Sequence, residues 1–197
     1  MSIGYALGKT PVVVLIGSTG SGKGTQCQTI SKKYGFTHIC TGDILREELK
    51  SNKAKGSEMV KLLNAGQLLP KDFVETLMKE YMLGAVTQKT AGFIIDGYPR
   101  DIAQGESFER KFKKPDVIIY LEVPDAVLAK RMNIRTGSGR SDDNAEAIAK
   151  RLRQFKESTM LLVEHYKKSG VLHVVNGNQD ENQVFSEIQK ILDTKYK

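Results

Sequence analysis

The chain has 197 residues, of which 40% are hydrophobic and 27% are charged. This balance is typical of a globular protein, so we expect residues 1–197 to form a single domain and exclude a disordered or collagen-like chain. Thirty Lys and Arg residues against 23 Asp and Glu residues leave a net charge of +7, which favours an anionic partner such as a nucleotide, a nucleic acid or a membrane surface.

Five short apolar runs predict buried β-strands. The first, residues 12–16, does not alternate between polar and apolar side chains, which indicates a strand buried on both faces. The others are a weaker run at 36–40 and the runs at 93–95, 117–121 and 171–175. Because helical spacing separates them, we expect an α/β fold, with a parallel sheet covered by helices and ligands at the C-terminal ends of the strands.

The helical segments are marked by apolar residues at helical spacing. In chain order they are a helix from Ser57 to Gly66, a helix over 73–81, a helix beginning near Pro124, one long helix over about 144–168, and a last helix after Asp180. The polar segment 135–144 separates two of them. It predicts either a solvated loop in which Asp142 or Asp143 caps the next helix, or a mobile flap that brings arginines to an anion.

A glycine-rich loop, GSTGSGKGT at 17–25, follows the first strand directly. Gly17, Gly22 and Lys23 fit the phosphate-loop spacing Gly-x-x-x-x-Gly-Lys, although Gly24 stands where the strict motif has Ser or Thr and Thr25 comes one residue later. Glycines can turn backbone N–H groups toward phosphate oxygens, and the N-terminus of the following helix adds its positive dipole. The alternative is a flexible loop without a ligand.

A second motif, DGYPR at 96–100, follows the third strand. A carboxylate at a strand end beside a phosphate loop is well placed to hold Mg²⁺ through water, so Asp96 is the candidate metal residue. Its alternative is an ordinary aspartate at the end of a strand. The GTPase signature Asn-Lys-x-Asp is missing from the sequence, which disfavours a GTPase.

Six arginines are candidates for stabilising phosphate charge, and each could instead simply be solvated. They are Arg46, Arg100, Arg131, Arg135, Arg140 and Arg151. Transfer of a phosphoryl group between two phosphates gathers negative charge, so cations help, and a phosphate acceptor needs no general base because it is already largely a dianion. We therefore interpret the three histidines, His38, His165 and His173, as structural.

Together these segments resemble the adenylate kinase family of nucleoside monophosphate kinases, and most closely its short-lid, cytosolic type. The matching segments are GSTGSGKGTQ at 17–26, TGDILR at 41–46, GQLLP at 66–70, DGYPR at 96–100, Gln104, and GRSDDN at 139–144. The resemblance implies a P-loop nucleotide-binding fold in which a five-stranded parallel sheet carries a small AMP-binding helical arm at 41–71 and a short lid at 133–143. It also implies reversible, Mg²⁺-dependent transfer of the γ-phosphoryl group of ATP to AMP, giving two ADP.

The resemblance further implies a role for each matching residue. The cations expected to stabilise the moving group are Lys23, Arg46, Arg100, Arg131, Arg135, Arg140 and Arg151. The residues expected to hold ATP are Gly20, Ser21, Gly22, Lys23, Gly24, Thr25, Arg131, Arg135 and, where the family has glycine, Gln179. The residues expected to hold AMP are Thr41, Gly42, Arg46, Gln67, Leu68, Leu69, Gly97, Tyr98, Pro99, Arg100, Gln104, Arg140 and Arg151.

Three departures from the family pattern accompany this match, and Gln179 in place of the family glycine is one of them. Ser18 and Thr19 stand where the family usually has Gly-Pro, which should change the stiffness of the loop. The lid is one residue shorter than usual between Arg135 and Arg140. It also contains no cysteine, so no structural zinc is expected there.

The main alternative is a UMP/CMP kinase, which shares nearly every phosphate-binding residue. Thr41 and Gln104 favour adenine, because pyrimidine relatives usually have Ala at the first position and an Asn-containing stretch around the second. A P-loop ATPase acting on nucleic acid should carry a patch rich in aromatic and basic residues, and no such patch is evident. A regulator that binds nucleotide without catalysis should lack some of the matched arginines.

The remaining expectations concern compartment and partners. Two cysteines, Cys27 and Cys40, are too few for a disulfide framework, which favours a reducing, cytoplasmic environment. The longest apolar run is far too short to span a membrane. We expect ATP, AMP and ADP as ligands of a monomer that binds neither nucleic acid nor membranes.

Overall fold

The computed structural model describes residues 3–51, 56–135 and 144–196. Its centre is a five-stranded sheet in the order β2-β3-β1-β4-β5, and every neighbouring pair is parallel. The strands are β1 (Val12–Gly17), β2 (Phe36–Cys40), β3 (Gly92–Asp96), β4 (Val117–Glu122) and β5 (Leu172–Asn176). The expected α/β fold with five parallel strands is confirmed, and each strand lies within one residue of its predicted bounds.

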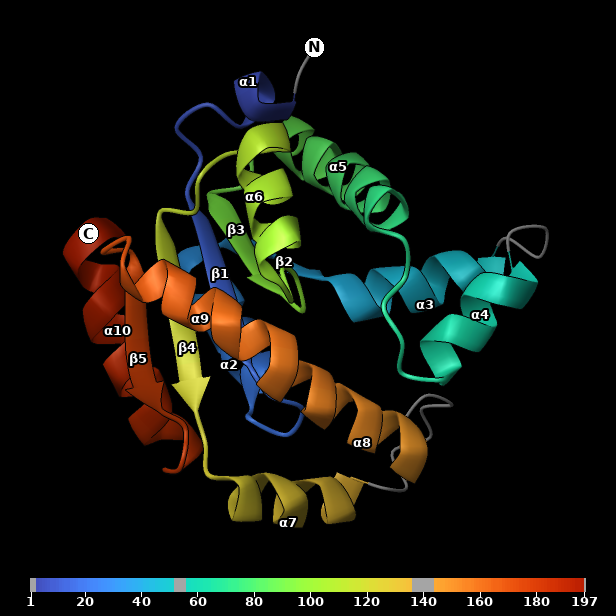
Figure 1. Ribbon diagram of the computed structural model, residues 1–197. Helices are drawn as coiled ribbons and strands as arrows, with labels where there is room; N and C mark the ends of the chain where they lie inside the picture. Colours follow the sequence, from blue (N-terminus) through green and yellow to red (C-terminus); the bar gives the residue numbers. More distant parts are fainter. Residues whose placement is uncertain (1–2, 52–55, 136–143, 197) are drawn as a thin grey trace.

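Helices cover both faces of the sheet, as Figure 1 shows. They are α1 (Ile3–Leu7), α2 (Lys23–Tyr34), α3 (Thr41–Ser51), α4 (Gly56–Asn64), α5 (Lys71–Thr87), α6 (Ile102–Lys111), α7 (Asp125–Arg135), α8 (Ala145–Gln154), α9 (Met160–Lys167) and α10 (Glu181–Tyr196). Within the described residues, no helix is both long enough and apolar enough to cross a membrane.

Two apolar cores hold these layers together, one on each side of the sheet. Alternate residues of β1 enter different cores: Val12 and Val14 pack with α1, α5, α6 and α9, whereas Val13 and Leu15 pack with α2 and α10. All four side chains are at most 1% exposed, which explains why the run lacks polar alternation. The sheet is therefore a rigid platform for the loops that follow its strands.

The long helix predicted over 144–168 is wrong in one respect, because a π-helical turn interrupts it. The turn, η2 (Phe155–Thr159), separates α8 from α9. A single π-helical turn inside a longer helix has no signature of residue type, so the sequence does not reveal it. The cap predicted for this helix is also corrected: the N-cap is Asn144, whose side chain accepts a hydrogen bond from the backbone N–H of Ala147 at 2.8 Å. The predicted caps, Asp142 and Asp143, lie outside the described residues.

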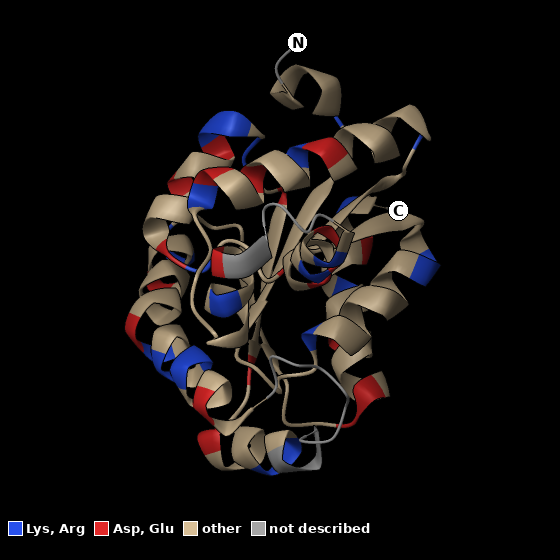
Figure 2. Ribbon diagram, turned by 90° about the vertical axis from the view of Figure 1, so that its right-hand side faces the viewer, with Lys and Arg blue, Asp and Glu red and all other residues tan. Residues whose placement is uncertain are grey.

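Helices α3 and α4 extend to one side of the sheet (Figure 1) and make up the described part of the expected arm at 41–71. The helix predicted to start at Ser57 begins at Gly56, and the one predicted near Pro124 begins at Asp125. The lid expected at 133–143 lies outside the described residues except for its first three, which end α7. Figure 2 shows Lys and Arg interspersed with Asp and Glu along the outer helices of that view.

Candidate active site

The phosphate loop is preshaped by two glycines in the left-handed backbone region. Gly20 has φ 87° and Gly22 has φ 94°, and α2 begins immediately afterwards at Lys23. Such φ values strain any residue with a Cβ, so the loop conformation depends on these glycines. The Lys23 ammonium donates a hydrogen bond to the backbone oxygen of Ser18 at 3.0 Å, which holds the cation inside the turn of the loop.

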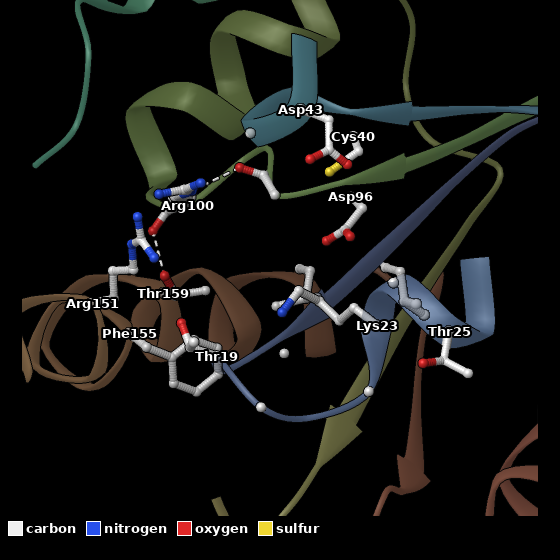
Figure 3. Close-up of a pocket in the computed structure, with 18 of the residues that line it drawn as sticks. Thr19, Lys23, Thr25, Cys40, Asp43, Asp96, Arg100, Arg151, Phe155 and Thr159 are labelled. Atoms are coloured by element: carbon white, nitrogen blue, oxygen red, sulfur yellow. Dashed lines mark hydrogen bonds between the residues drawn. The ribbon is translucent and has the colours of Figure 1, made fainter. Parts of the chain in front are cut away.

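A cleft of about 590 Å³ opens between this loop, the C-terminal ends of β1, β2 and β3, and helices α3 and α8. Figure 3 shows Lys23, Asp96, Arg100 and Arg151 around it. The predicted site residues that line it are Gly20, Gly22, Lys23, Gly24, Thr25, Gly42, Arg46, Gln67, Asp96, Gly97, Pro99, Arg100, Arg131 and Arg151. The sheet therefore gathers residues that lie up to 131 positions apart, from Gly20 to Arg151, into one cavity.

The cleft is strongly cationic at its centre. Burial and the neighbouring charge of Arg151 lower the pKa of Arg100, while Asp96 works in the opposite direction. Burial likewise lowers the pKa of Lys23, against the attraction of Asp96 and together with the repulsion of Arg100. Cations held this close together repel one another, and a bound polyphosphate would offset that repulsion.

Arg100 is held in place by three hydrogen bonds. Its Nε donates to the Gly97 oxygen at 2.7 Å, its backbone N–H donates to Oε1 of Gln104 at 2.8 Å, and its carbonyl accepts from the Thr159 hydroxyl at 2.7 Å. Thr159 belongs to η2, so the π-helical turn directly supports the DGYPR loop. Sequence reasoning missed Thr159, because nothing distinguishes a threonine that faces a loop from one that faces solvent.

Four other cations differ in how completely the structure describes them. Arg131 of α7 donates to the backbone oxygen of Gly177 at 3.0 Å, which ties α7 to the segment after β5. Arg46 forms an ion pair with Asp43, one turn earlier on α3. Arg135 ends α7, and its side chain lies outside the described part of the structure, as does the whole of Arg140.

A smaller pocket adjoins the cleft and contains the remaining predicted AMP residues. It is lined by Thr41, Gln67, Leu68, Leu69, Gly97, Tyr98, Arg100 and Gln104, with Leu45, Leu63 and Val74. Gln104 is buried, and its Oε1 is occupied by the Arg100 amide. Within the described chain its Nε2 has no protein partner, so this side chain can donate to a base but has already used its acceptor.

Gly97 fixes the close approach between β3 and the start of α3. Its φ is 82°, and a Cβ there would lie 2.7 Å from the Thr41 hydroxyl oxygen. That hydroxyl donates to the backbone oxygen of Asp96 at 3.2 Å. Glycine is therefore required at this position. The next bond, Tyr98–Pro99, is a cis peptide.

Two predicted ATP residues do not line the cleft. The backbone N–H of Ser21 donates to the Ser18 oxygen at 3.1 Å, inside the loop itself. The Gln179 amide donates to the Asn176 oxygen at 3.0 Å and to Glu187 at 2.7 Å, so its side chain is engaged by the protein. These bonds use only the side-chain amide of Gln179, so its backbone is available to contact a nucleotide.

A buried ionic network beneath the DGYPR loop was not predicted. Glu75 of α5 is 3% exposed and accepts hydrogen bonds from the Tyr98 hydroxyl at 2.6 Å and the Lys111 ammonium at 2.5 Å. Burial alone would raise the pKa of Glu75, but the hydrogen bonds from Lys111, Tyr98 and Ser107 outweigh it and lower that pKa. Tyr98 and Lys111 lie 23 and 36 residues away from Glu75 in the chain. No pattern in the sequence links the three, so the network could not be predicted.

Asp96 has the donors and the place that Mg²⁺ would need. It is 7% exposed, ends β3 and lies in the same cleft as Thr25, which follows Lys23 by two residues. Carboxylate and hydroxyl oxygens are ligands that Mg²⁺ accepts, usually together with waters and substrate phosphates. His38 and Cys40, at the end of β2, also line this wall, and His38 was expected to be only structural.

Comparisons with known proteins agree on one family. A family model described as Adenylate kinase matches residues 15–171. The chain is 40% identical over 190 residues to Adenylate kinase isoenzyme 1 of Sus scrofa, which covers 95% of this chain and 97% of that protein. Identity to the Caenorhabditis elegans protein of that name is 40% over 184 residues (93% and 88% covered), and to the Homo sapiens protein 39% over 189 residues (95% and 96%).

Proposed function

This chain belongs to the adenylate kinase family, and we propose which residues of its cleft bind ATP, which bind AMP and which stabilise the phosphoryl group during transfer. The activity is the reversible transfer of the γ-phosphoryl group of ATP to AMP, which gives two molecules of ADP. The substrates are nucleotides, in agreement with the cationic cleft.

ATP is assigned to the phosphate loop. Gly20, Gly22, Gly24 and Thr25 present backbone N–H groups and a hydroxyl at the cleft, while Lys23 supplies a fixed ammonium. Ser21 shapes the loop through its bond to Ser18. Arg131 of α7 donates to the Gly20 oxygen of this loop at 3.5 Å. We assign Arg131 and Arg135 to the ATP phosphates, and the backbone of Gln179 to the nucleoside end.

AMP is assigned to the cleft wall formed by the arm at 41–71 and the DGYPR loop. The residues are Thr41, Gly42, Arg46, Gln67, Leu68, Leu69, Gly97, Tyr98, Pro99, Arg100 and Gln104, with Arg151 on the phosphate side. We also assign Arg140 to the AMP phosphate. The free Nε2 of Gln104 suits a ring-nitrogen acceptor of adenine. Arg46 and Arg100 are placed to hold the AMP phosphate.

Catalysis by these residues is positioning together with charge stabilisation. The acceptor phosphate is mostly a dianion at neutral pH and attacks without a base, so the protein has to overcome repulsion between phosphates. Lys23, Arg100 and Arg151 surround one space in the cleft. The lid at 133–143 is proposed to bring Arg135 and Arg140 to the same space and exclude water.

Asp96 is proposed to hold Mg²⁺ through water, with Thr25 on the same wall. When bound, Mg²⁺ supplies positive charge to the phosphate oxygens of ATP. The contribution of the chain itself is to keep the Asp96 carboxylate at the strand end, where β3 fixes it beside Lys23.

We further propose that the chain works as a monomer in the cytosol. Both of its cysteines are free thiols, which suits a reducing compartment.

The observation that carries the assignment is the convergence of the phosphate loop with Arg46, Arg100, Arg131 and Arg151 on one cleft. A panel of nucleoside monophosphates with MgATP, followed by ADP formation, tests it. AMP should give the highest kcat/KM. A higher value for CMP or UMP would contradict the adenine assignment of Thr41 and Gln104.

A further inference from the structure

Three side chains with metal-binding atoms meet behind the phosphate loop. They are Cys27 of α2, His38 of β2 and Asp96 of β3, and one ligand atom of each lies within 4.8 Å of the other two. Cys27 is 0% exposed and Asp96 is 7% exposed. Among the described residues, this is the one such group of three or more.

Phosphoryl transfer does not explain this cluster. The Nε2 atom of His38 is shielded from solvent, has no hydrogen-bond partner among the described residues, and lies 3.9 Å from the Asp96 carboxylate, which is too far for a hydrogen bond. Cys27 takes no part in the proposed mechanism. Buried polar atoms are nearly always paired, so an unpaired imidazole nitrogen facing a carboxylate and a thiol needs a reason.

The chemistry of the three donors selects a particular class of ion. Sulfur, imidazole nitrogen and a single carboxylate are typical ligands of Zn²⁺, whereas Mg²⁺ prefers oxygen. Tetrahedral zinc bonds of about 2.0–2.3 Å put neighbouring ligand atoms about 3.3–3.5 Å apart, so side-chain rotations that shorten the spacing by roughly 1 Å would complete the site. A thiolate and a carboxylate also neutralise the two charges of the ion.

We propose that Cys27, His38 and Asp96 form a binding site for a thiophilic divalent cation of the zinc class, and that its occupation inhibits the enzyme. His38 and Asp96 line the cleft, so the fourth ligand position is reached from there. On binding, the Cys27 thiol releases its proton to the solvent and becomes the thiolate ligand.

We expect the bound cation to inhibit phosphoryl transfer because the site shares Asp96 with the proposed magnesium site and lies next to Lys23. The inhibition rests on the proposed function, whereas the binding site does not. The ion would occupy the carboxylate that we assign to magnesium-bound water. It would also cancel the negative charge that Asp96 presents to Lys23, a residue whose pKa responds to both Asp96 and Cys27. Lys23 and Arg100 repel the cation, and the two anionic ligands offset that repulsion.

Binding is tested with Co²⁺ as a spectroscopic probe on the reduced, nucleotide-free protein. One tightly bound equivalent should give tetrahedral visible bands and a thiolate-to-cobalt band in the near ultraviolet, and Zn²⁺ should displace it. Cys27→Ala and His38→Gln should each weaken binding by about 100-fold or more, above the loss caused by outer-shell changes. The matched controls, Cys40→Ala in the same cleft and His173→Gln on β5, should bind like the wild type.

The absence of a thiolate-to-cobalt band in the wild type would overturn the proposed site. A band that persists in Cys27→Ala and disappears in Cys40→Ala would also overturn it. Thermal unfolding gives an independent readout, because an ion that binds only the folded chain raises Tm. Zinc should raise the Tm of the wild type and of Cys40→Ala, but not that of Cys27→Ser, which keeps the shape of the side chain. Equal shifts in all three proteins would also overturn it.

Measurements of turnover test whether zinc bound at this site inhibits the enzyme, separately from whether it binds. With saturating MgATP and AMP and a buffered concentration of free Zn²⁺, the wild type and Cys40→Ala should lose activity relative to their own zinc-free rates, whereas Cys27→Ala should resist. Cobalt binding as expected with turnover unchanged by zinc would retain the site and overturn the inhibition. If AMP is not the preferred acceptor in the panel of nucleoside monophosphates, the proposed function is wrong, but the evidence from cobalt binding for the metal site is unaffected.

Discussion

The Tyr98 hydroxyl donates a 2.6 Å hydrogen bond to the Glu75 carboxylate, beneath the loop that we assign to AMP. Tyr98 is 3% exposed, as is Glu75. A hydrogen bond to a buried charged group is among the stronger ones, because losing the donor leaves the carboxylate both desolvated and underpaired. The bond therefore links the packing of α5 to the position of the DGYPR loop.

Tyr98→Phe should lower the free energy of unfolding by about 1–3 kcal/mol, as measured by denaturant titration. Tyr81→Phe is the matched control, since the Tyr81 hydroxyl makes the same kind of bond to Glu47, at 3.0 Å, on the surface. It should change stability by no more than about 0.5 kcal/mol. Equal losses in the two variants would show that burial adds nothing to the Tyr98 bond.

Glu75 should also make stability depend on pH. Its folded-state pKa is lowered below the ordinary value of 4.5, so its contribution is present above that pH and is lost as the pH falls through the folded-state pKa. Between about pH 6 and about pH 3, Glu75→Gln should lose less stability than the wild type. Asp72→Asn, which removes the exposed partner of the same lysine, should follow the wild type more closely; identical curves for Glu75→Gln and wild type would refute the assignment.

Lys23→Met should lower kcat by about 10²–10³, because it removes the one ammonium held inside the phosphate loop. Stability should not fall, since burial already disfavours this charge in the folded protein. Lys32→Met, on the exposed surface of the same helix, is the control and should keep normal turnover. Turnover by Lys23→Met close to that of Lys32→Met would exclude the phosphate-loop assignment.

Thr159→Val should weaken AMP binding several-fold, a loss on the order of 1 kcal/mol, because the Arg100 carbonyl loses its donor and the loop can shift. Initial rates should show the change mainly in the KM for AMP. Thr159→Ser should restore it, and Thr87→Val, which removes an exposed hydroxyl bonded to the Leu83 oxygen within α5, should have no effect. A KM unaltered in Thr159→Val would mean that η2 does not position the AMP loop.

The strands and the phosphate loop were predictable from the sequence because their causes are local. A strand buried on both faces must be continuously apolar, and the loop needs glycines and a lysine at fixed spacing. The strand order was harder, since β2 pairs with β3 across the 51 residues between Cys40 and Gly92. That pairing places Cys40 beside Asp96 in the register and brings His38 to the same wall.

The parts that could not be predicted depend on contacts between distant segments. A π-helical turn changes the backbone by one residue but leaves the composition of the helix unchanged. Glu75 looks like an ordinary surface glutamate in the sequence, and only the packing of α5 against α6 and the DGYPR loop buries it. The lid at 133–143, with Arg140, lies outside the described residues, so its role stays a prediction.

The most direct measurement follows the phosphoryl group itself. The protein is given ATP that carries a radioactive label only in its γ-phosphoryl group, together with AMP and Mg²⁺, and the products are separated after less than one turnover. The cleft geometry predicts that the label appears in the β-phosphate of the ADP formed from AMP, and that Lys23→Met slows its appearance by about 10²–10³. Label released as inorganic phosphate, at a rate that does not depend on AMP, would contradict direct transfer between two nucleotides in this cleft.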